Sequence, residues 1–174
     1  MTGRVVGSYR ITSSAHADHF EATTKFDLRP LFKLPGLKLE LGRLSLLPHY
    51  RRETLLKLLW CGVREYALKA EANYLFGCAT VPTTNEGTAR AISKWLGDHG
   101  ANSEELFVSP HPNREFEPDP RNKRRKGPFG PIYLPPLFSW YLKTGARIAS
   151  APALDKKHRG SDFLMLVNRA TFCA

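Results

Sequence analysis

One strand-to-helix junction carries the residues of this sequence that are best suited to chemistry. Leu37–Leu47 alternates apolar with polar residues over most of its length, which predicts a strand that carries Glu40 and Arg43. Arg51 and Arg52 come next, directly before a long helical pattern. The first N–H groups of a helix have no partner within it, so two arginines beside them predict an anion site suited to phosphate.

Glu40 and Arg43 are three positions apart, so their side chains leave opposite faces of a regular strand. A β-bulge would bring both side chains to one site. The purely structural alternative for Glu40 is a solvated or salt-bridged strand carboxylate. For Arg51 and Arg52 it is a helix start that faces water.

Hydrophobic periodicity predicts the elements that position this junction, and their order indicates an α/β or α+β domain with a mixed sheet over residues 1–174. Strands are predicted at Arg4–Thr12, Leu37–Leu47, Asn73–Val81, Ala146–Ala149 and Asp162–Val167. Helices are predicted near Phe26–Phe32, at Arg52–Glu71, after a cap at Thr83 or Thr84, and at Pro135–Lys143. Residues 100–132 lack periodicity and contain the basic run Arg121–Lys126, so we expect a long Pro-rich loop there.

Composition narrows the class of partner and the compartment. The chain has 174 residues, 42% hydrophobic and 24% charged, which excludes a wholly disordered protein. Its net charge of +10 predicts an acidic partner, which could be nucleic acid, an anionic membrane surface or an acidic protein. Three cysteines do not make a disulfide framework, and we expect Cys61 and Cys78 to be core thiols of a cytoplasmic protein. We recognise no signal peptide, no membrane-spanning helix, and no metal ligands to join His16 and His19.

Four sequence blocks follow one another along the chain. They are VVGSYRI at Val5–Ile11, ELGRLSLLPHYRR at Glu40–Arg52, LLWCGVREYALKAEANYLFGCATV at Leu58–Val81, and LPPLFSWYLKTGARIASAPALD at Leu134–Asp155, with SDFLML closing the series at Ser161–Leu166. Together they resemble the GNAT-superfamily N-acyltransferases that make N-acyl amino acids and lyso-ornithine lipid from acyl carrier protein thioesters. The Glu-x-x-Arg pattern is also similar to that of the acyl-homoserine-lactone synthases. The resemblance implies a GNAT-like fold, with a mixed and mostly antiparallel central sheet flanked by helices.

The resemblance also implies a reaction and an acceptor site. A long-chain fatty acyl group, with or without a 3-hydroxy group, would pass from acyl carrier protein to the α-amine of an amino acid, ornithine being the expected acceptor. No cofactor would be bound, because the acyl-phosphopantetheine is a substrate. Glu40 would be the catalytic base, and Arg43 would orient Glu40 or bind the acceptor's carboxylate. Arg10 would face the same site, and Tyr141 would give a proton to the leaving thiolate.

The resemblance also implies where the acyl donor binds: its phosphopantetheine arm at the strand-to-helix junction, and its carrier protein at the basic loop. Backbone N–H groups near Leu46 and Leu47 would polarise the thioester carbonyl, and Arg51 and Arg52 would bind the phosphopantetheine phosphate. The acidic carrier protein or an anionic membrane surface would contact the basic loop through Lys123, Arg124, Arg125 and Lys126. The enzyme could therefore touch the inner face of the membrane peripherally.

Two departures from the family pattern keep alternatives open. Family members carry an opening strand, two helices and another strand before the block at Val5–Ile11, and we expect that part to be missing here. Arg51–Leu56 lacks the glycine-rich turn that binds the pyrophosphate of coenzyme A, which favours a carrier protein with its single phosphodiester. The alternatives are an inactive or fragmentary relative that binds acyl carrier protein, and a basic nucleic-acid-binding module. Nucleic acid is the less favoured partner, because the chain has no recognition motif beyond its basic run.

Overall fold

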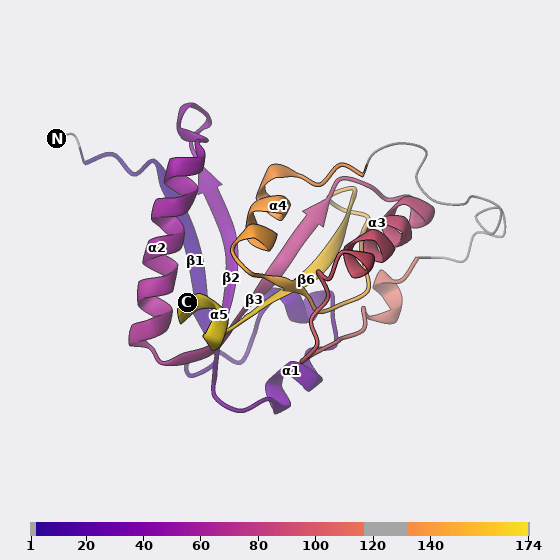
Figure 1. Cartoon of the computed structure of the whole chain (residues 1–174), viewed down its shortest axis with the longest axis horizontal. Helices are drawn as coiled ribbons and strands as arrows, with labels where there is room; N and C mark the ends of the chain where they lie inside the picture. Colours follow the sequence, from indigo (N-terminus) through magenta and orange to yellow (C-terminus); the bar gives the residue numbers. More distant parts are fainter. Residues whose placement is uncertain (1–2, 117–131, 174) are drawn as a thin grey trace.

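The computed structural model describes residues 3–116 and 132–173, and it is built around a six-stranded sheet (Figure 1). The basic run Arg121–Lys126 lies outside the described residues. The strands are β1 (Gly7–Ser13), β2 (Leu37–Leu46), β3 (Ala72–Val81), β4 (Arg147–Ile148), β5 (Ala153–Asp155) and β6 (Gly160–Asn168). The α-helices are α1 (Arg29–Lys33), α2 (Glu53–Lys69), α3 (Glu86–Asp98), α4 (Pro136–Lys143) and α5 (Arg169–Cys173), and the short 3₁₀ turns are η1 (Glu21–Thr24), η2 (Pro48–Tyr50) and η3 (Pro112–Arg114).

The sheet has the order β1-β2-β3-β6-β4, with β5 pairing to β6 beside this path. All its strand pairs are antiparallel except β2 with β3, which are parallel. This parallel pairing begins at Leu37 with Ala72 and ends at Glu40 with Phe76. Beyond it β2 continues along β1 and β3 continues along β6, so the two strands separate, as Figure 1 shows.

Gly77 lies at the point where the strands separate. A Cβ atom there would stand 2.4 Å from the carbonyl oxygen of Leu41, which is closer than any side chain permits. Glycine therefore allows the two backbones to touch immediately before they diverge.

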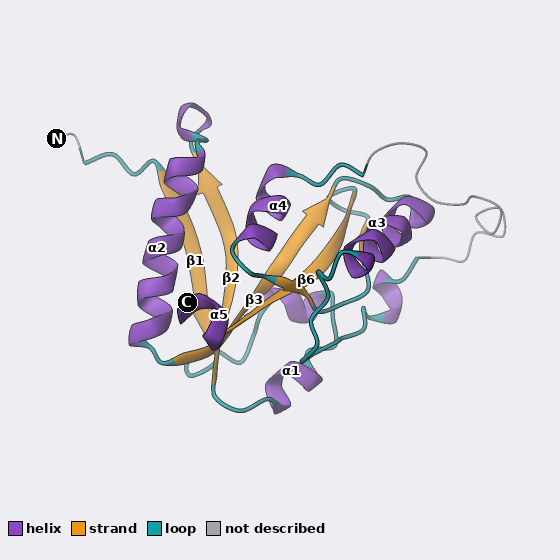
Figure 2. Cartoon of the chain, in the orientation of Figure 1, coloured by secondary structure: helices purple, strands orange, loops and turns teal. Residues whose placement is uncertain are grey.

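Each face of the sheet has its own core. Helices α2, α3, α4 and α5 cover one face and pack on Leu75, Phe163 and Met165, while η1 and α1 cover the other face and pack on Phe76 and Leu164 (Figure 2). This alternation along neighbouring strands is the period-two pattern of a sheet that is buried on both sides.

Helix α5 was not predicted, and the other helices follow the predicted periodicity with two corrections. Helix α3 is capped by Asn85, whose side-chain oxygen accepts from the N–H of Thr88 at 2.9 Å, and not by Thr83 or Thr84. Cys61 is exposed on α2, so its prediction as a core thiol was wrong, because the helix turns Val63 and Ala67 toward the sheet instead.

Candidate active site

Glu40 lies at the centre of the face covered by η1, and its carboxylate is 2% exposed. One carboxylate oxygen accepts from the N–H of Ala22 at 2.7 Å, and the other accepts from the N–H of Glu21 at 3.0 Å. The Arg10 guanidinium is 3.4 Å from the second oxygen. Glu40 therefore fixes the start of η1 on the sheet, whatever else it does.

A bulge in β2 brings Arg43 to the same side as Glu40. The pairing of β1 with β2 shifts register between Ser8 and Arg10, and Arg43 has a φ of +55° in the left-handed region. Such an irregularity re-aims the side chain that follows it. Both Glu40 and Arg43 consequently line one cavity, although they are three positions apart in a strand.

Glu21 joins the two arginines of this cavity. Its carboxylate accepts from Arg10 at 2.9 Å and from the Arg43 Nε at 3.0 Å. Partial burial alone would raise the pKa of Glu21, but the charge of Arg43 and the hydrogen bond from Arg10 outweigh burial and lower that pKa. Gly42 leaves room for the arrangement, since a Cβ there would lie 3.2 Å from the Arg10 guanidinium.

The cavity has a volume of about 490 Å³ and is open to solvent. Its charged lining is Arg10, Arg43, Lys25, Arg114 and Lys157 against Glu21, Glu40 and Asp155, with His19 and His158 beside them. Five cationic side chains and three carboxylates favour a ligand that carries an anionic group.

Lys25 and Asp155 form the wall of the cavity away from β1. Lys25 pairs with Asp162 at 2.7 Å and lies 3.7 Å from Asp155. Burial would raise the pKa of Asp155, but hydrogen bonds from the side chain and backbone of His158 outweigh it and lower the pKa to about 2. Asp155 therefore stays charged at neutral pH, and Lys25 ties it and Asp162 together in this wall.

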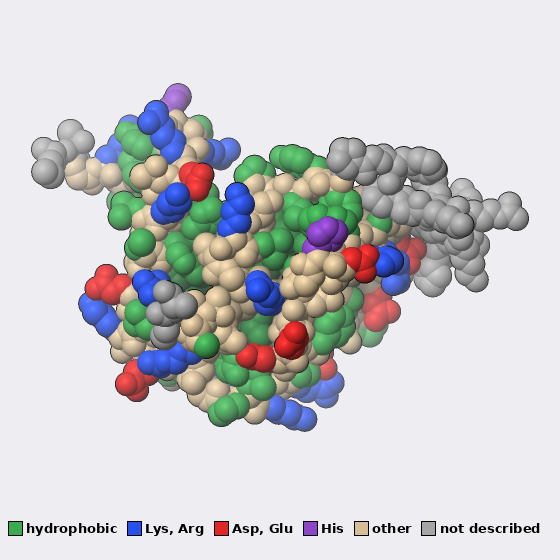
Figure 3. All heavy atoms as spheres, viewed as in Figure 1, with side chains coloured by type: hydrophobic (Ala, Val, Ile, Leu, Met, Phe, Trp, Pro, Cys, Tyr) green, Lys and Arg blue, Asp and Glu red, His purple; other side chains and the backbone are tan. Residues whose placement is uncertain are grey.

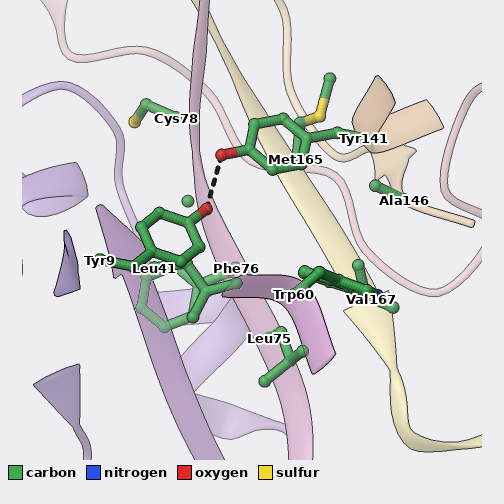
Figure 4. Close-up of a pocket in the computed structure, with 11 residues that line it drawn as sticks. Tyr9, Leu41, Trp60, Leu75, Phe76, Cys78, Tyr141, Ala146, Met165 and Val167 are labelled. Atoms are coloured by element: carbon green, nitrogen blue, oxygen red, sulfur yellow. Dashed lines mark hydrogen bonds between the residues drawn. The ribbon is translucent and has the colours of Figure 1, made fainter. Parts of the chain in front are cut away.

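A small apolar pocket lies at the opening between β2 and β3, toward the helices (Figure 4). Its residues come from both cores, since Leu75 belongs to the helix-covered core and Cys78 packs on the other. The hydroxyls of Tyr9 and Tyr141 point at each other in it, 2.5 Å apart. Burial raises the pKa of the Cys78 thiol, so that thiol is an inert part of the lining.

The end of β2 is a basic surface. Arg51 and Arg52 are exposed there beside η2 and the start of α2, and Figure 3 shows Lys and Arg side chains gathered around this turn. Arg51 Nε also donates to the carbonyl of Leu46 at 3.5 Å. The N–H of Leu47 donates to the carbonyl of Val6 at 2.9 Å in this structure, and its part in polarising a thioester stays a prediction.

The structure thus groups the predicted site residues in three places. Arg10, Glu40 and Arg43 meet at the cavity, Tyr141 lies at the apolar pocket, and Arg51 and Arg52 lie beyond Leu46 at the end of β2. Lys123, Arg124, Arg125 and Lys126 lie outside the described residues. The sequence analysis missed Glu21 and Tyr9, although Tyr9 stands next to Arg10 in a strand whose alternation places it on the opposite face.

Two negative findings hold for the part of the chain that the structure describes. No group of three or more His, Cys, Asp or Glu side chains within residues 3–116 and 132–173 could hold a metal ion. No helix in these residues combines the length and apolar character that crossing a membrane requires.

Comparison with known proteins first gives the class. Residues 1–61 match a family model described as an acetyltransferase (GNAT) domain, and this segment contains Arg10, Glu40 and Arg43. The predicted fold class, a GNAT-like mixed and mostly antiparallel sheet flanked by helices, is confirmed. No solved structure shows a significant match to the chain.

The individual relatives are more specific. The chain is 30% identical over 171 residues to the L-ornithine N(alpha)-acyltransferase of Rhizobium meliloti (strain 1021), covering 94% of this chain and 57% of the relative. It is 30% identical over 173 residues to the protein of the same name from Agrobacterium fabrum (strain C58 / ATCC 33970), covering 94% of this chain and 58% of that relative. The chain is therefore similar over 94% of its length to two proteins named L-ornithine N(alpha)-acyltransferase, and it spans 57% to 58% of the length of these two proteins.

Proposed function

We propose that this chain is an N-acyltransferase that transfers a long-chain fatty acyl group from acyl carrier protein to the α-amine of ornithine. The observation that carries the proposal is the convergence of Arg10, Glu40 and Arg43 on one cavity beside the opening between β2 and β3. The similarity to proteins named L-ornithine N(alpha)-acyltransferase supports the acceptor.

The cavity accommodates the acceptor amino acid. Arg10 and Arg43 both bind the carboxylate of Glu21, and Arg10 also reaches Glu40 at 3.4 Å, so their remaining N–H donors are open to the carboxylate of a substrate. Glu40 takes the proton from the amine. Because Glu40 is buried and already accepts two backbone N–H groups, the proton travels through a water that uses one of its free lone pairs.

The donor approaches on the other face of the sheet. A thioester between β2 and β3 has Glu40 on one side and the Tyr9–Tyr141 pocket on the other, and Tyr141 protonates the leaving thiolate. Arg51 and Arg52 bind the phosphate of the donor, about 20 Å from Glu40 at the usual rise of an extended strand. The site is therefore long and narrow, which suits the phosphopantetheine arm of a carrier protein.

Charge supports the choice of an acidic carrier protein. The net charge of +10 favours acidic partners, and we propose that Lys123, Arg124, Arg125 and Lys126 dock the carrier protein or an anionic membrane surface. The protein then works in the cytoplasm, in peripheral contact with the membrane that receives its product.

Mass spectrometry of a reconstituted reaction tests this function. Purified protein is mixed with long-chain acyl carrier protein and a pool of amino acids that includes ornithine. We expect N-acyl ornithine, and a decrease in its formation of about 100-fold or more for Glu40→Gln. The matched control is Glu65→Gln on α2, an exposed glutamate that pairs with Lys69 at 2.7 Å and should keep full activity.

Other outcomes decide against parts of the proposal. A Glu40→Gln variant with full activity would remove the base from the mechanism. An absence of product from a wild-type protein that melts cooperatively would support the inactive, carrier-binding alternative. A different acyl amino acid as the main product would replace ornithine as the acceptor.

A further inference from the structure

The Tyr9–Tyr141 pair joins two distant parts of the chain by their hydroxyl groups. Tyr9 lies on β1 and Tyr141 on α4, and their oxygens are 2.5 Å apart (Figure 4). Each tyrosine hydroxyl can donate one hydrogen bond. One of the two protons lies between the oxygens, so the pair has one further O–H to offer.

Within residues 3–116 and 132–173, that second O–H has no acceptor. Among the residues that the structure describes, neither hydroxyl has a side-chain hydrogen bond other than the one they share. The rest of the pocket is apolar and includes Leu41, Trp60 and Met165. A buried donor without an acceptor costs free energy, so the pocket favours a ligand that places an acceptor atom there.

The pair is asymmetric in its acidity. Burial raises the pKa of both phenols, and the neighbouring Tyr141 raises that of Tyr9 further, whereas the hydrogen bond from Tyr9 lowers that of Tyr141. Tyr141 is therefore the first of the two to give up its proton, and Tyr9 then keeps its own proton and donates to the Tyr141 oxygen. When Tyr9 is the donor of the shared hydrogen bond, the Tyr141 O–H is free to point into the opening between β2 and β3.

We propose that Tyr9 is a positioning residue that holds the Tyr141 hydroxyl toward the thioester sulfur and stabilises the Tyr141 oxygen after it gives up its proton. This inference rests on the proposed function. The amine nitrogen bonds to the thioester carbonyl carbon, and the C–S bond breaks with its electron pair on sulfur. Sulfur takes the proton of Tyr141, whose phenolate accepts from Tyr9 until solvent returns the proton that the amine lost.

A double-mutant cycle on acyl transfer tests the role of Tyr9. The variants are Tyr9→Phe, Tyr141→Phe and the double variant, assayed with acyl carrier protein as donor, and Tyr133→Phe is the control because Tyr133 is 71% exposed. We expect Tyr9→Phe to lower kcat by about 10- to 100-fold at an unchanged KM, as the loss of general-acid assistance does. The double variant should be no slower than Tyr141→Phe, because the two residues act as a unit.

A donor that needs no acid provides the second readout. This donor is the S-phenyl thioester of the same fatty acid. Its leaving group is thiophenolate, a stabilised thiolate that departs without a proton, so Tyr9→Phe should slow its reaction much less. Equal losses with both donors, additive effects in the cycle, or an unchanged kcat for Tyr9→Phe would each overturn the role of Tyr9. If the S-phenyl thioester is not a substrate, the cycle with the carrier-protein donor decides.

Folding and function are separated by two further measurements. Thermal melts show whether Tyr9→Phe folds, and if it does not, 3-fluorotyrosine at position 9 changes the acidity of the hydroxyl while keeping it in place. An unchanged kcat with 3-fluorotyrosine would then overturn the inference. An inactive wild-type protein contradicts the proposed function, whereas an active wild type that does not need Tyr9 contradicts only this inference.

Discussion

Replacing Glu40 by glutamine should destabilise the protein as well as inactivate it. The carboxylate accepts from two backbone N–H groups, at 2.7 Å from Ala22 and 3.0 Å from Glu21, and it is 2% exposed. A glutamine oxygen can replace only one of these acceptors, because its NH₂ group cannot accept. The loss of one charge-assisted bond and the unpaired buried N–H should together lower the free energy of unfolding by about 2–4 kcal/mol. For a domain of this size that corresponds to a decrease in Tm of about 4–16 °C.

Urea and thermal unfolding, followed by far-UV circular dichroism, measure this loss, with Glu21→Gln as the matched control. Among the described residues, the Glu21 side chain binds the guanidinium groups of Arg10 and Arg43, and it is 38% exposed, so its replacement should cost about 1 kcal/mol or less. The Glu21 variant should instead raise the KM for the acceptor, since it releases Arg43 and leaves Arg10 with only its 3.4 Å contact to Glu40 among the described carboxylates. If Glu40→Gln unfolds within about 1 kcal/mol of the wild type, Glu40 does not hold η1 in place and our reasoning from its hydrogen bonds is refuted.

Three other predictions concern the elements around the site. The hydrogen bonds from His158 outweigh the burial of Asp155 and lower its folded-state pKa from 3.8 to about 2. The ionised Asp155 therefore stabilises the fold above pH 3.8, and this contribution is lost as the pH falls toward 2. The Tm difference between wild type and Asp155→Asn should accordingly shrink between pH 5 and pH 2, and a constant difference would contradict the assignment. Gly77→Ala should lower the free energy of unfolding in urea by about 1–3 kcal/mol and weaken donor binding, since the added Cβ would lie 2.4 Å from the Leu41 carbonyl oxygen. A variant as stable as the wild type would show that the strands separate elsewhere. Asn85→Ala should lower the free energy of unfolding by about 0.5–2 kcal/mol, and no change would mean that another residue caps α3.

The long elements were predictable from the sequence because periodicity is a local property. The strands at Leu37–Leu46 and Ala72–Val81 and the helix at Glu53–Lys69 lie within two residues of their predicted bounds. The short strand Ala153–Asp155 and the 3₁₀ turns were not predicted. Three or four residues carry too little pattern to be recognised, and such segments form because neighbouring elements hold them.

The candidate site was predictable only in part. The sequence indicated Glu40 and Arg43 and the need for a bulge, but it did not indicate the left-handed backbone of Arg43 or the carboxylate of Glu21 that joins Arg10 to Arg43. A partly buried glutamate in a segment without periodicity has no local signal. Only the packing of η1 on the sheet brings it to the two arginines.

The sequence by itself therefore determined the order of strands and helices, the basic net charge, and the junction that carries Glu40, Arg43, Arg51 and Arg52. Tertiary structure decided which of these groups meet. It placed Tyr9 against Tyr141, which is 132 positions away, and it brought Glu21 to Arg10 and Arg43. The physical reason is that alternation and helical period follow from neighbouring dihedral angles, whereas a site forms only when the packing of separate elements overcomes the entropy of closing the chain between them.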